Sequence, residues 1–369
     1  MKNYRIAVLA GDGIGPEVVE GTRVVLQAVD DLLRQGGSSL DLVDMAMGLE
    51  AYENCGHTLP PETLVGAQEC DGILMGPIMN HIYAIGEPGV VNPSKVFRKE
   101  LDLFANIRPV RAYPGIKALY QDVDIVVVRE NTEGFYADRN VLDGNGELRP
   151  DADTVVSVRV VTRRASERIA QTAFEVARQR GGKRRVSVAH KANVLRKGCG
   201  LFLEACRAVA ADFPDITLDA FHVDALAMHL VMRPSEFDVI VSTNLFGDVL
   251  SDLTAGLVGG LGLAPGLNAG RSLAMAQAVH GSAPDIAGLN IANPIAEILS
   301  AALLLRWLAE RHGDTALIRI ASLIEEAVAL TIKEGTGLTP DLGGSGSTLD
   351  VAHSVVESIG TLASLSIGA

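Results

Sequence analysis

The chain has 369 residues, and 48% of them are hydrophobic, which is enough apolar material to fill the cores of two lobes. Its 32 basic and 45 acidic residues give a net charge of −13. This charge argues against a general nucleic-acid binder and against a protein that binds acidic membranes, because both need a basic face. An anionic ligand must therefore meet a local cluster of arginines.

The sequence shows no sign of export or of a membrane anchor. The apolar run before Asp12 is too short for a signal-peptide core, and no stretch is long and uncharged enough for a membrane span. The 4 cysteines form no CxxC pair and no disulfide-dense pattern. We therefore expect a cytoplasmic protein with reduced thiols.

Short β-branched runs alternate with longer segments of helical periodicity along the chain. Strands are expected at residues 5–9, 72–75, 124–128, 155–161, 185–189 and 239–242, and helices at about 163–180, 192–210 and 296–311. Such alternation predicts an α/β fold whose sheets are largely buried.

Two acidic residues stand one helical turn apart after the strand at 239–242. The segment Asn244-Leu-Phe-Gly-Asp248-Val-Leu-Ser-Asp252 enters a helix, which puts both aspartates on one helical face. Their carboxylates repel each other unless a cation lies between them; stabilisation of a helix N-terminus explains only Asp248. Asp224 follows another apolar strand and could complete an all-oxygen site, which suits Mg²⁺ or Mn²⁺ rather than zinc.

Lys191 stands where the strand at 185–189 gives way to a helix, at the sheet edge where α/β folds place ligands. A lysine that is buried near a divalent cation has a lowered pKa and can act as a base. The alternative is that Lys191 is simply solvated, as most lysines are. The dense polar turn from Arg129 to Tyr136 follows another buried strand and is a candidate rim of an active site.

Three arginines, Arg98, Arg108 and Arg129, fall at or near the ends of elements in a chain that is acidic overall. Guanidinium groups make bidentate contacts with carboxylates, so a substrate with two or three carboxylates would use several of them. Surface salt bridging is the alternative for any one of the three.

The glycine run Gly11-Asp-Gly-Ile-Gly-Pro-Glu17 follows the first strand and opens a helix, as a dinucleotide-binding fingerprint does. The match is poor, because the third glycine comes too early, a proline follows it, and no acid stands at the expected distance after a second strand. The run therefore does not predict a Rossmann site.

Taken together, these segments resemble the isocitrate/isopropylmalate dehydrogenase family of β-decarboxylating dehydrogenases, and more closely its isocitrate and homoisocitrate members. The resemblance extends from the glycine run to Thr339-Pro-Asp-Leu-Gly-Gly344, and so covers nearly the whole chain. The longest motifs are Leu103-Phe-Ala-Asn-Ile-Arg-Pro109, Arg129-Glu-Asn-Thr-Glu-Gly134, His190-Lys-Ala-Asn193, Asn244-Leu-Phe-Gly-Asp248 and His280-Gly-Ser-Ala-Pro-Asp-Ile-Ala-Gly288.

The resemblance implies a two-lobed fold with the active site in a cleft. A large cofactor-binding lobe would comprise residues 1–103 and 260–369, and a small lobe, residues 104–259, would hold substrate and metal and form a homodimer or a larger homo-oligomer. Each site would then borrow Lys191 and Asp224 from the partner subunit.

The resemblance also implies that the cofactor is NAD and that its site is not of the Rossmann type. The residues that match the family's cofactor site are His280, Gly281, Ser282, Ala283, Asp285, Ile286, Asn293 and Asp341. At the positions of Asp285 and Ile286, family members that use NADP typically have a Lys-Tyr pair. A carboxylate accepts hydrogen bonds from a ribose hydroxyl but repels a 2′-phosphate, so NAD is expected to be preferred.

The implied chemistry is oxidative decarboxylation of a 2-hydroxy-3-carboxy acid. A metal held by Asp224, Asp248 and Asp252 would chelate the hydroxyl and its neighbouring carboxylate. Lys191, with Asp224, would take the hydroxyl proton, and Tyr136 would return a proton to carbon after CO₂ leaves. Arg98, Arg108 and Arg129 would hold the carboxylates.

The substrate interpretation rests on Asn92 and Ser94. Isocitrate enzymes typically have the pattern Ser-x-Asn-x-x-x-Arg here, whereas isopropylmalate enzymes have leucines at the positions of the serine and asparagine. Burying an isopropyl group here would leave polar groups unpaired at about 1–3 kcal/mol each, so an isocitrate- or homoisocitrate-like acid is favoured. Because Asn92 and Ser94 stand in the reverse order of that pattern, 3-isopropylmalate, tartrate and D-malate remain alternative substrates.

Two other classes of protein are also considered. A non-catalytic regulatory subunit would be expected to lose the lysine, the tyrosine or a metal aspartate, and all are present. A simple dicarboxylate-binding module would not need Lys191 and Tyr136 opposite a metal site.

Overall fold

The computed structural model describes residues 2–84, 86–135 and 146–367 of the chain. Its main feature is a 10-stranded sheet with the strand order β2-β1-β3-β12-β11-β4-β5-β10-β8-β9. These strands are β1 (Lys2–Leu9), β2 (Ser38–Asp44), β3 (Gly72–Met75), β4 (Ala105–Arg111), β5 (Asp124–Glu130), β8 (Arg185–His190), β9 (Thr217–His222), β10 (Val239–Ser242), β11 (Leu267–Ala269) and β12 (Ala274–Ala276). The α/β fold class expected from the sequence is confirmed.

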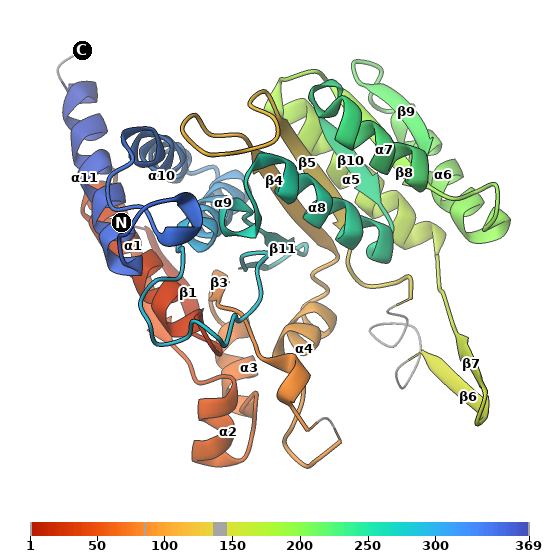
Figure 1. Cartoon of the computed structure of the whole chain (residues 1–369), viewed down its shortest axis with the longest axis horizontal. Coiled ribbons are helices and arrows are strands. Elements are labelled where there is room, and N and C mark those ends of the chain that lie inside the picture. The colour runs from red at the N-terminus through yellow and green to blue at the C-terminus, as the bar shows by residue number, and fades with distance from the viewer. Residues whose placement is uncertain (1, 85, 136–145, 368–369) are drawn as a thin grey trace.

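The sheet has two parallel sections joined by an antiparallel middle. β11 pairs antiparallel with both β12 and β4, and β4 pairs antiparallel with β5, whereas the remaining ladders are parallel. Figure 1 shows the two chain ends, red and blue, in one half of the molecule and the yellow and green middle of the chain in the other half. The sheet runs through both halves, and its antiparallel strands β11 and β4 lie in the middle.

Helices cover both faces of the sheet. They are α1 (Gly15–Gln35), α2 (Leu49–Cys55), α3 (Pro61–Gln68), α4 (Pro93–Glu100), α5 (Arg163–Arg180), α6 (Arg196–Ala210), α7 (Val223–Met232), α8 (Asn244–Val258), α9 (Ile295–His312), α10 (Thr315–Glu334) and α11 (Thr348–Ile367). Short 3₁₀ turns lie at η1 (Asn80–Ile82), η2 (Pro234–Glu236), η3 (Leu261–Leu263) and η4 (Pro340–Leu342).

Alternate residues of each strand enter different cores, as the period of two requires. Val126 and Val128 of β5 belong to the largest core, which also contains buried side chains of α1, α5, α6, α9, α10 and α11. Ile125 and Val127 point the other way, into a core formed with α7 and α8. In the other half, Ala7 and four further strand residues form a third core with Phe97 of α4.

Most of the expected elements are present, and α5 has the predicted bounds. Thr162 caps its first turn by accepting from the Ala165 amide at 3.2 Å, and Gly181 ends it at φ +62°. The helix expected at 192–210 begins only at Arg196, because the amides of Val194 and Leu195 close a turn onto the Lys191 carbonyl.

A strand forms at the start of the range expected at 155–161, but the predicted C-terminal bound and the expected burial are wrong. Strand β7 (Thr154–Ser157) ends at Ser157 and pairs only with β6 (Glu147–Asp151), in a two-stranded ribbon whose residues are all exposed. Figure 1 shows this ribbon extending away from the body of the protein. A β-branched run predicts that a strand forms, but it does not predict whether another layer packs against that strand.

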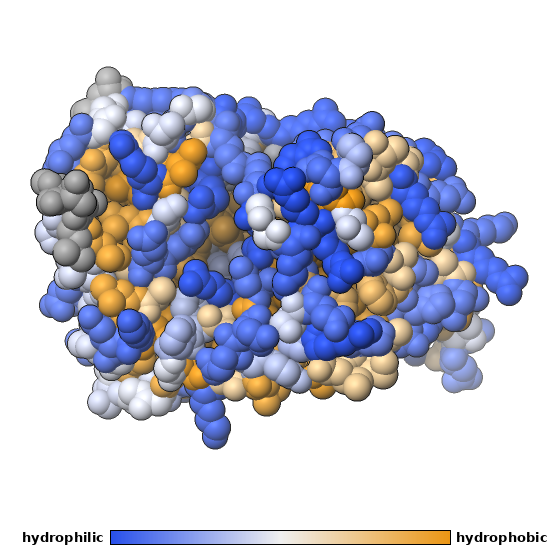
Figure 2. All heavy atoms as spheres, turned by 90° about the horizontal axis from the view of Figure 1, so that it is seen from above, coloured by the Kyte–Doolittle hydropathy of each residue, from blue (hydrophilic) through white to orange (hydrophobic). Residues whose placement is uncertain are grey.

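No helix in the described part of the chain is long and apolar enough to cross a membrane. Figure 2 shows a face on which hydrophilic side chains predominate and hydrophobic ones form smaller patches between them.

A buried amide network fastens the antiparallel middle of the sheet. Asn268 of β11 accepts at Oδ1 from Asn106 Nδ2 at 2.7 Å and from Asn131 Nδ2 at 3.0 Å. Asn106 in turn accepts from Arg108 Nε at 2.7 Å. The position of Arg108 therefore depends on a side chain that lies more than 150 residues away in the sequence.

Replacing Asn268 with alanine removes the acceptor that Asn106 and Asn131 share. Asn131 Nδ2 also donates to the Leu103 carbonyl, but the buried Asn106 amide loses its acceptor at a cost of about 1–3 kcal/mol, so we expect a clearly lower midpoint of urea unfolding. Asn54→Ala, at an exposed position near the end of α2, is the control and should leave the midpoint unchanged. Equal midpoints for the wild type and Asn268→Ala would show that the network does not hold the sheet together.

Candidate active site

Two buried arginines and two aspartates form a cluster where β4, β5 and α8 meet. Arg108 Nη1 lies 3.2 Å from Asp248 Oδ1 and 3.3 Å from Asp252 Oδ1, and Arg129 Nη1 also donates to Asp248. The side chains of Arg108 and Arg129 are 10% and 3% exposed, and those of Asp248 and Asp252 are 34% and 54% exposed. The prediction that both aspartates lie on one helical face is confirmed, and the cluster has a cationic base and an acidic rim.

The start of α8 is shaped to hold Arg129. Asn244 accepts at Oδ1 from Arg129 Nε at 3.0 Å and from Nη2 at 2.6 Å. Gly247 has no room for a side chain, since a Cβ there would lie 2.8 Å from the Cβ and Cγ of Arg129. The sequence Asn244-Leu-Phe-Gly-Asp248 thus lets α8 approach β5 closely. Asn244 accepts hydrogen bonds from Arg129, and the missing side chain of Gly247 leaves room for this arginine.

The two positive and two negative charges of the cluster cancel, but burial and like-charge neighbours still disfavour the charged forms of Arg108 and Asp252. Burial and the neighbouring Arg129 lower the pKa of Arg108 to about 10, although Asp248 and Asp252 oppose this. Burial also raises the pKa of Asp252, and the negative charge of Asp248 adds to the effect. The arginines would gain from a carboxylate ligand and the aspartates from a cation, so the cluster suits a ligand that brings both.

The donor set fits a hard divalent cation only in part. Asp248 and Asp252 supply carboxylate oxygens, the type of ligand that Mg²⁺ and Mn²⁺ prefer. Within the described ranges of the chain, however, no three His, Cys, Asp or Glu side chains converge into a metal site. A single chain therefore does not bring Asp224 to the other two aspartates.

Asp224 instead pairs with Lys191. Lys191 Nζ donates to Asp224 Oδ1 at 2.5 Å, and this bond holds the pKa of Asp224 below its usual value. The side chains are 25% and 67% exposed, so the pair lies at the surface of the chain at the start of α7. The two residues that the sequence assigned to proton transfer are thus in contact with each other.

The residues assigned to the distal part of the substrate lie on α4. Ser94 Oγ and Arg98 Nη2 both donate to Gln277 Oε1, at 3.4 and 3.2 Å. Asn92 caps the helix, accepting from the Lys95 amide at 3.0 Å. Its carbonyl oxygen therefore has a structural role that the sequence interpretation did not include, while Gln277 links α4 to the segment that leads to His280.

The glycine run, rejected as a Rossmann fingerprint, supports the predicted cofactor loop. The Ile14 amide donates to the Ser282 carbonyl at 2.9 Å, and a Cβ on Gly13 would lie 2.1 Å from that oxygen. Ala283 and Ile286 pack against the small core of Ile14 and its neighbours. The loop at 280–288 is thus held by the run, and Gly281 and Asp285 remain exposed on it.

His280, Asn293 and Asp341 meet at the other side of this loop. Asn293 Nδ2 donates to Asp341 Oδ2 at 3.0 Å, and Gly262 packs so closely on the pair that a Cβ would lie 2.9 Å from Asp341. Burial lowers the pKa of His280, and its Nε2 is shielded from solvent without a hydrogen-bond partner among the described residues. An unsatisfied ring nitrogen beside exposed loop backbone fits a site that a polar cofactor group completes.

Tyr136, the predicted proton donor to carbon, lies outside the described residues. The polar turn before it is buried: Glu130 accepts from the amides of Thr132 and Glu133 at 3.0 and 2.7 Å. Sequence reasoning missed four polar side chains that support the site, namely Asn244, Ser251, Gln277 and Glu297. Of these, only Asn244 had a signal, as the residue that opens the motif of Asp248.

Comparisons with known proteins agree with this geometry. The family model "Isocitrate/isopropylmalate dehydrogenase" matches residues 5–359. The 3-isopropylmalate dehydrogenase of Archaeoglobus fulgidus is 46% identical over 95% of this chain and 98% of its own, and the isocitrate/homoisocitrate dehydrogenase of Thermus thermophilus is 43% identical over 97% and 99%. The crystal structure of isocitrate dehydrogenase from Methylococcus capsulatus aligns with a TM-score of 0.84 at 39% identity, covering 96% of this chain and 99% of that one.

A site of paired arginines and aspartates on this sheet, in a chain so closely related to known dehydrogenases, defines an oxidoreductase that oxidises and decarboxylates hydroxy acids. The chain belongs to the isocitrate/isopropylmalate dehydrogenase family.

A buried carboxyl group behind the predicted cofactor loop makes stability depend on pH. Glu297 of α9 is 0% exposed, and its Oε2 accepts from the Ala278 amide at 2.8 Å. Its Oε1 has no partner among the described residues, and burial raises the pKa of the carboxyl to about 8. The unfolded chain releases this proton at a much lower pH, so the folded state loses stability as pH rises toward about 8.

Glu297→Gln should weaken this pH dependence, because glutamine keeps the shape and does not ionise. Between about pH 5 and about pH 8, we expect the melting temperature of the variant to rise relative to that of the wild type. Glu357→Gln, at an exposed position on α11, is the matched control and should follow the wild type. A constant difference between Glu297→Gln and wild type across this range would contradict the assignment.

Proposed function

We propose that the enzyme catalyses NAD-dependent oxidative decarboxylation of a 2-hydroxy-3-carboxy acid of the isocitrate or homoisocitrate type. The observation that carries the proposal is the cluster of Arg108, Arg129, Asp248 and Asp252 at the junction of β4, β5 and α8. Its cationic base can bind substrate carboxylates in bidentate fashion, and its acidic rim can bind the cation that a chelating hydroxy acid needs.

Asp248 and Asp252 would hold Mg²⁺ or Mn²⁺ together with the partner's Asp224. A cation bound there would supply Lewis-acid chemistry to the hydroxyl and carboxylate oxygens of the substrate. Arg108 and Arg129 orient the substrate by its carboxylates, and their burial excludes water from the reacting end. Arg98, which shares Gln277 with Ser94, is assigned to the distal end of the substrate.

Lys191 would take the hydroxyl proton as a neutral amine and become an ammonium group, with Asp224, 2.5 Å from its Nζ, holding it in place. Tyr136 is assigned to the return of a proton to carbon, on the strength of the family motif alone. Asp224 does not join Asp248 and Asp252 in a metal site within the described residues of one chain, so in this proposal a complete site is formed by two subunits.

Exposed apolar residues support a homodimer. Five of them lie on α7 and α8, which pack against each other and frame the site: Met228, Val231, Met232, Leu245 and Val249, at 50%, 47%, 69%, 37% and 61% exposed. Contiguous apolar surface of this kind is typical of a protein interface. The ribbon of β6 and β7, with Leu148, Val155 and Val156 exposed, is a second apolar surface for a partner. In this proposal the interface belongs to a small lobe of residues 104–259, and residues 1–103 and 260–369 form the large lobe.

NAD is proposed as the cofactor, bound at the loop of His280, Gly281, Ser282, Ala283, Asp285 and Ile286, with Asn293 and Asp341 nearby. The exposed carboxylate of Asp285 is suited to accept from a ribose hydroxyl and would repel a 2′-phosphate.

The substrate is the finer part of the proposal, because the names of the similar proteins include both isopropylmalate and isocitrate/homoisocitrate enzymes. Ser94 is buried and hydrogen-bonded to Gln277, and Asn92 is engaged in capping α4. An isopropyl group placed there would face polar atoms, so a polar or anionic substituent is favoured.

A screen of isocitrate, homoisocitrate, 3-isopropylmalate, tartrate and D-malate, with NAD or NADP and with Mg²⁺ or Mn²⁺, tests the activity. We expect isocitrate or homoisocitrate to give the highest kcat/KM, NAD to exceed NADP, and a chelator to abolish turnover. A ranking with 3-isopropylmalate first would overturn the substrate argument. Absence of turnover with every acid would favour a regulatory subunit.

Mixing two inactive variants tests whether subunits share sites. Lys191→Met removes the base, and the double variant Asp248→Asn/Asp252→Asn removes the metal ligands, so each alone should be inactive. In mixed dimers one of the two sites recovers a complete set, and random assembly should restore about a quarter of wild-type activity. Lys197→Met, on an exposed neighbour of the lysine, should keep full activity on its own. No recovery on mixing, with mixed dimers shown to form, would place each site within one chain.

A further inference from the structure

A cavity of about 670 Å³ lies on the face of the sheet opposite the arginine–aspartate cluster. Ile107, Pro109 and Arg111 of β4 line it, whereas Arg108, between them in the sequence, points through the other face to Asp248. The alternation of side chains along a strand requires this separation. The cavity is therefore distinct from the candidate active site, although one strand serves both.

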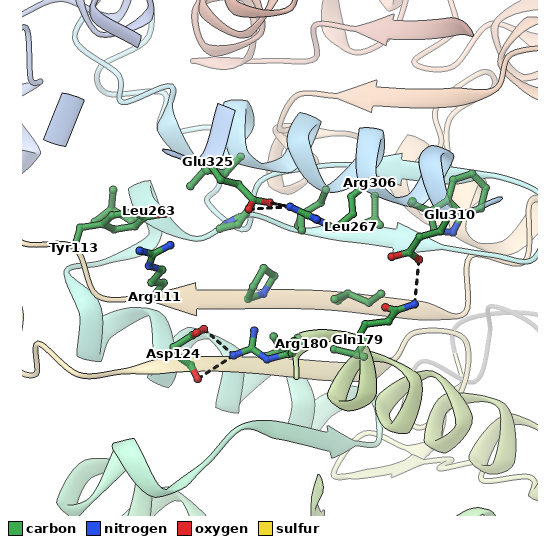
Figure 3. A pocket seen from close by; sticks show the side chains of 18 residues that line it. Arg111, Tyr113, Asp124, Gln179, Arg180, Leu263, Leu267, Arg306, Glu310 and Glu325 are labelled. Carbon is green, nitrogen blue, oxygen red and sulfur yellow. Dashed lines mark hydrogen bonds and ion pairs between the residues drawn. The ribbon is translucent and has the colours of Figure 1, made fainter. Parts of the chain in front are cut away.

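The floor of the cavity is apolar and its walls come from both halves of the molecule. Apolar side chains from β4, β5, β11 and α9 form the floor, including Val126, Leu267, Leu303 and Trp307. β5 and α5 form one wall, and α9 and α10 form the other, as Figure 3 shows. Cavities of this size and lining bind small molecules of drug-like dimensions.

Nearly every charged group on the walls is already paired. Arg306 donates to both carboxylate oxygens of Glu325 at 2.9 Å, and Arg180 donates to Asp124 at 2.8 Å. Figure 3 shows these two ion pairs on opposite walls. At one end of the cavity, Gln179 Nε2 of α5 donates to Glu310 Oε2 of α9 at 3.3 Å. The two ion pairs carry no net charge that a ligand could neutralise. Glu310 differs, because the side chain that donates to it is a neutral glutamine.

Arg111 is different. Its guanidinium lies 5.6 Å from the centre of the Tyr113 ring, and no carboxylate of the described residues forms an ion pair with it. It is exposed at the opposite end of the cavity from Glu310, as Figure 3 shows. A ligand that carries an anion can thus reach Arg111 while its apolar body covers the floor and stays clear of Glu310.

We propose that this cavity is a second ligand site, which binds a small monocarboxylate with an apolar or aromatic body. The carboxylate pairs with Arg111, and the body packs on Trp307 and the aliphatic floor. Because the walls belong to chain segments on either side of the middle of the sheet, an occupied cavity ties the two halves together. Binding is thermodynamically linked to any change in their spacing.

Trp307 is the only tryptophan of the chain, so its fluorescence reports on the cavity directly. The probe is 4-phenylbutyrate, titrated into the full-length protein, with the uncharged 4-phenylbutanamide as its matched analogue. We expect a saturable change in Trp307 fluorescence with the acid and an affinity lower by about tenfold or more for the amide.

Arg111→Gln should weaken binding of the acid by the same factor and leave the affinity of the amide unchanged. Arg233→Gln, at an exposed arginine next to η2, is the charge-matched control and should bind the acid as the wild type does. Equal affinities for acid and amide, wild-type affinity in Arg111→Gln, or no saturable change would each overturn the proposal.

A second measurement separates this site from the active site. Isocitrate with Mg²⁺ should not displace 4-phenylbutyrate from Trp307, because Arg108 and Arg111 face opposite sides of β4. Competitive displacement would show that the acid binds in the active site and would overturn the proposal. The fluorescence readout needs no turnover, so it stands or falls independently of the proposed reaction.

Discussion

The ion pairs that join Arg108 and Arg129 to Asp248 are the constraint on which the site depends. Two guanidinium groups are buried side by side at the junction of two strands, and they need more acceptors than the one that Asn106 of β4 provides. Helix α8 supplies them through Asn244, Ser251 and the aspartates. The helix must therefore lie close to the sheet, which is why Gly247 meets the side chain of Arg129 without room for a Cβ.

The middle of the sheet transmits this constraint to the rest of the molecule. β4 and β11 run antiparallel between two parallel sections, and Asn268 bonds to the residues on both sides. The position of Arg108 is thereby tied to the segment that continues through Gln277 to the cofactor loop. The residues proposed to bind substrate and cofactor come from distant parts of the sequence, and the polar network of Asn268, Asn106 and Arg108 fixes the position of the arginine among them.

The sequence predicted where helices and strands lie better than it predicted which of them are buried. Helix α5 has the expected bounds because its periodicity, its Thr162 cap and its Gly181 terminus are all local signals. The run at 155–161 has equally good strand propensity, yet only its first three residues form a strand, and that strand lies in an exposed ribbon, since burial depends on what packs against a strand. Short strands such as β11 and β12, with three residues each, carry no periodicity long enough to detect.

For the site, the sequence alone determined which chemical groups are available and which of them are near in the chain: Asp248 and Asp252 one turn apart, and Lys191 and Asp224 each after a strand. Local geometry decides such relations, because helical spacing operates over a few residues. Only the tertiary structure decided that Arg108 meets both aspartates and that the glycine run supports the loop at 280–288. These contacts join residues far apart in the chain, and it is the order of strands in the sheet that brings them together.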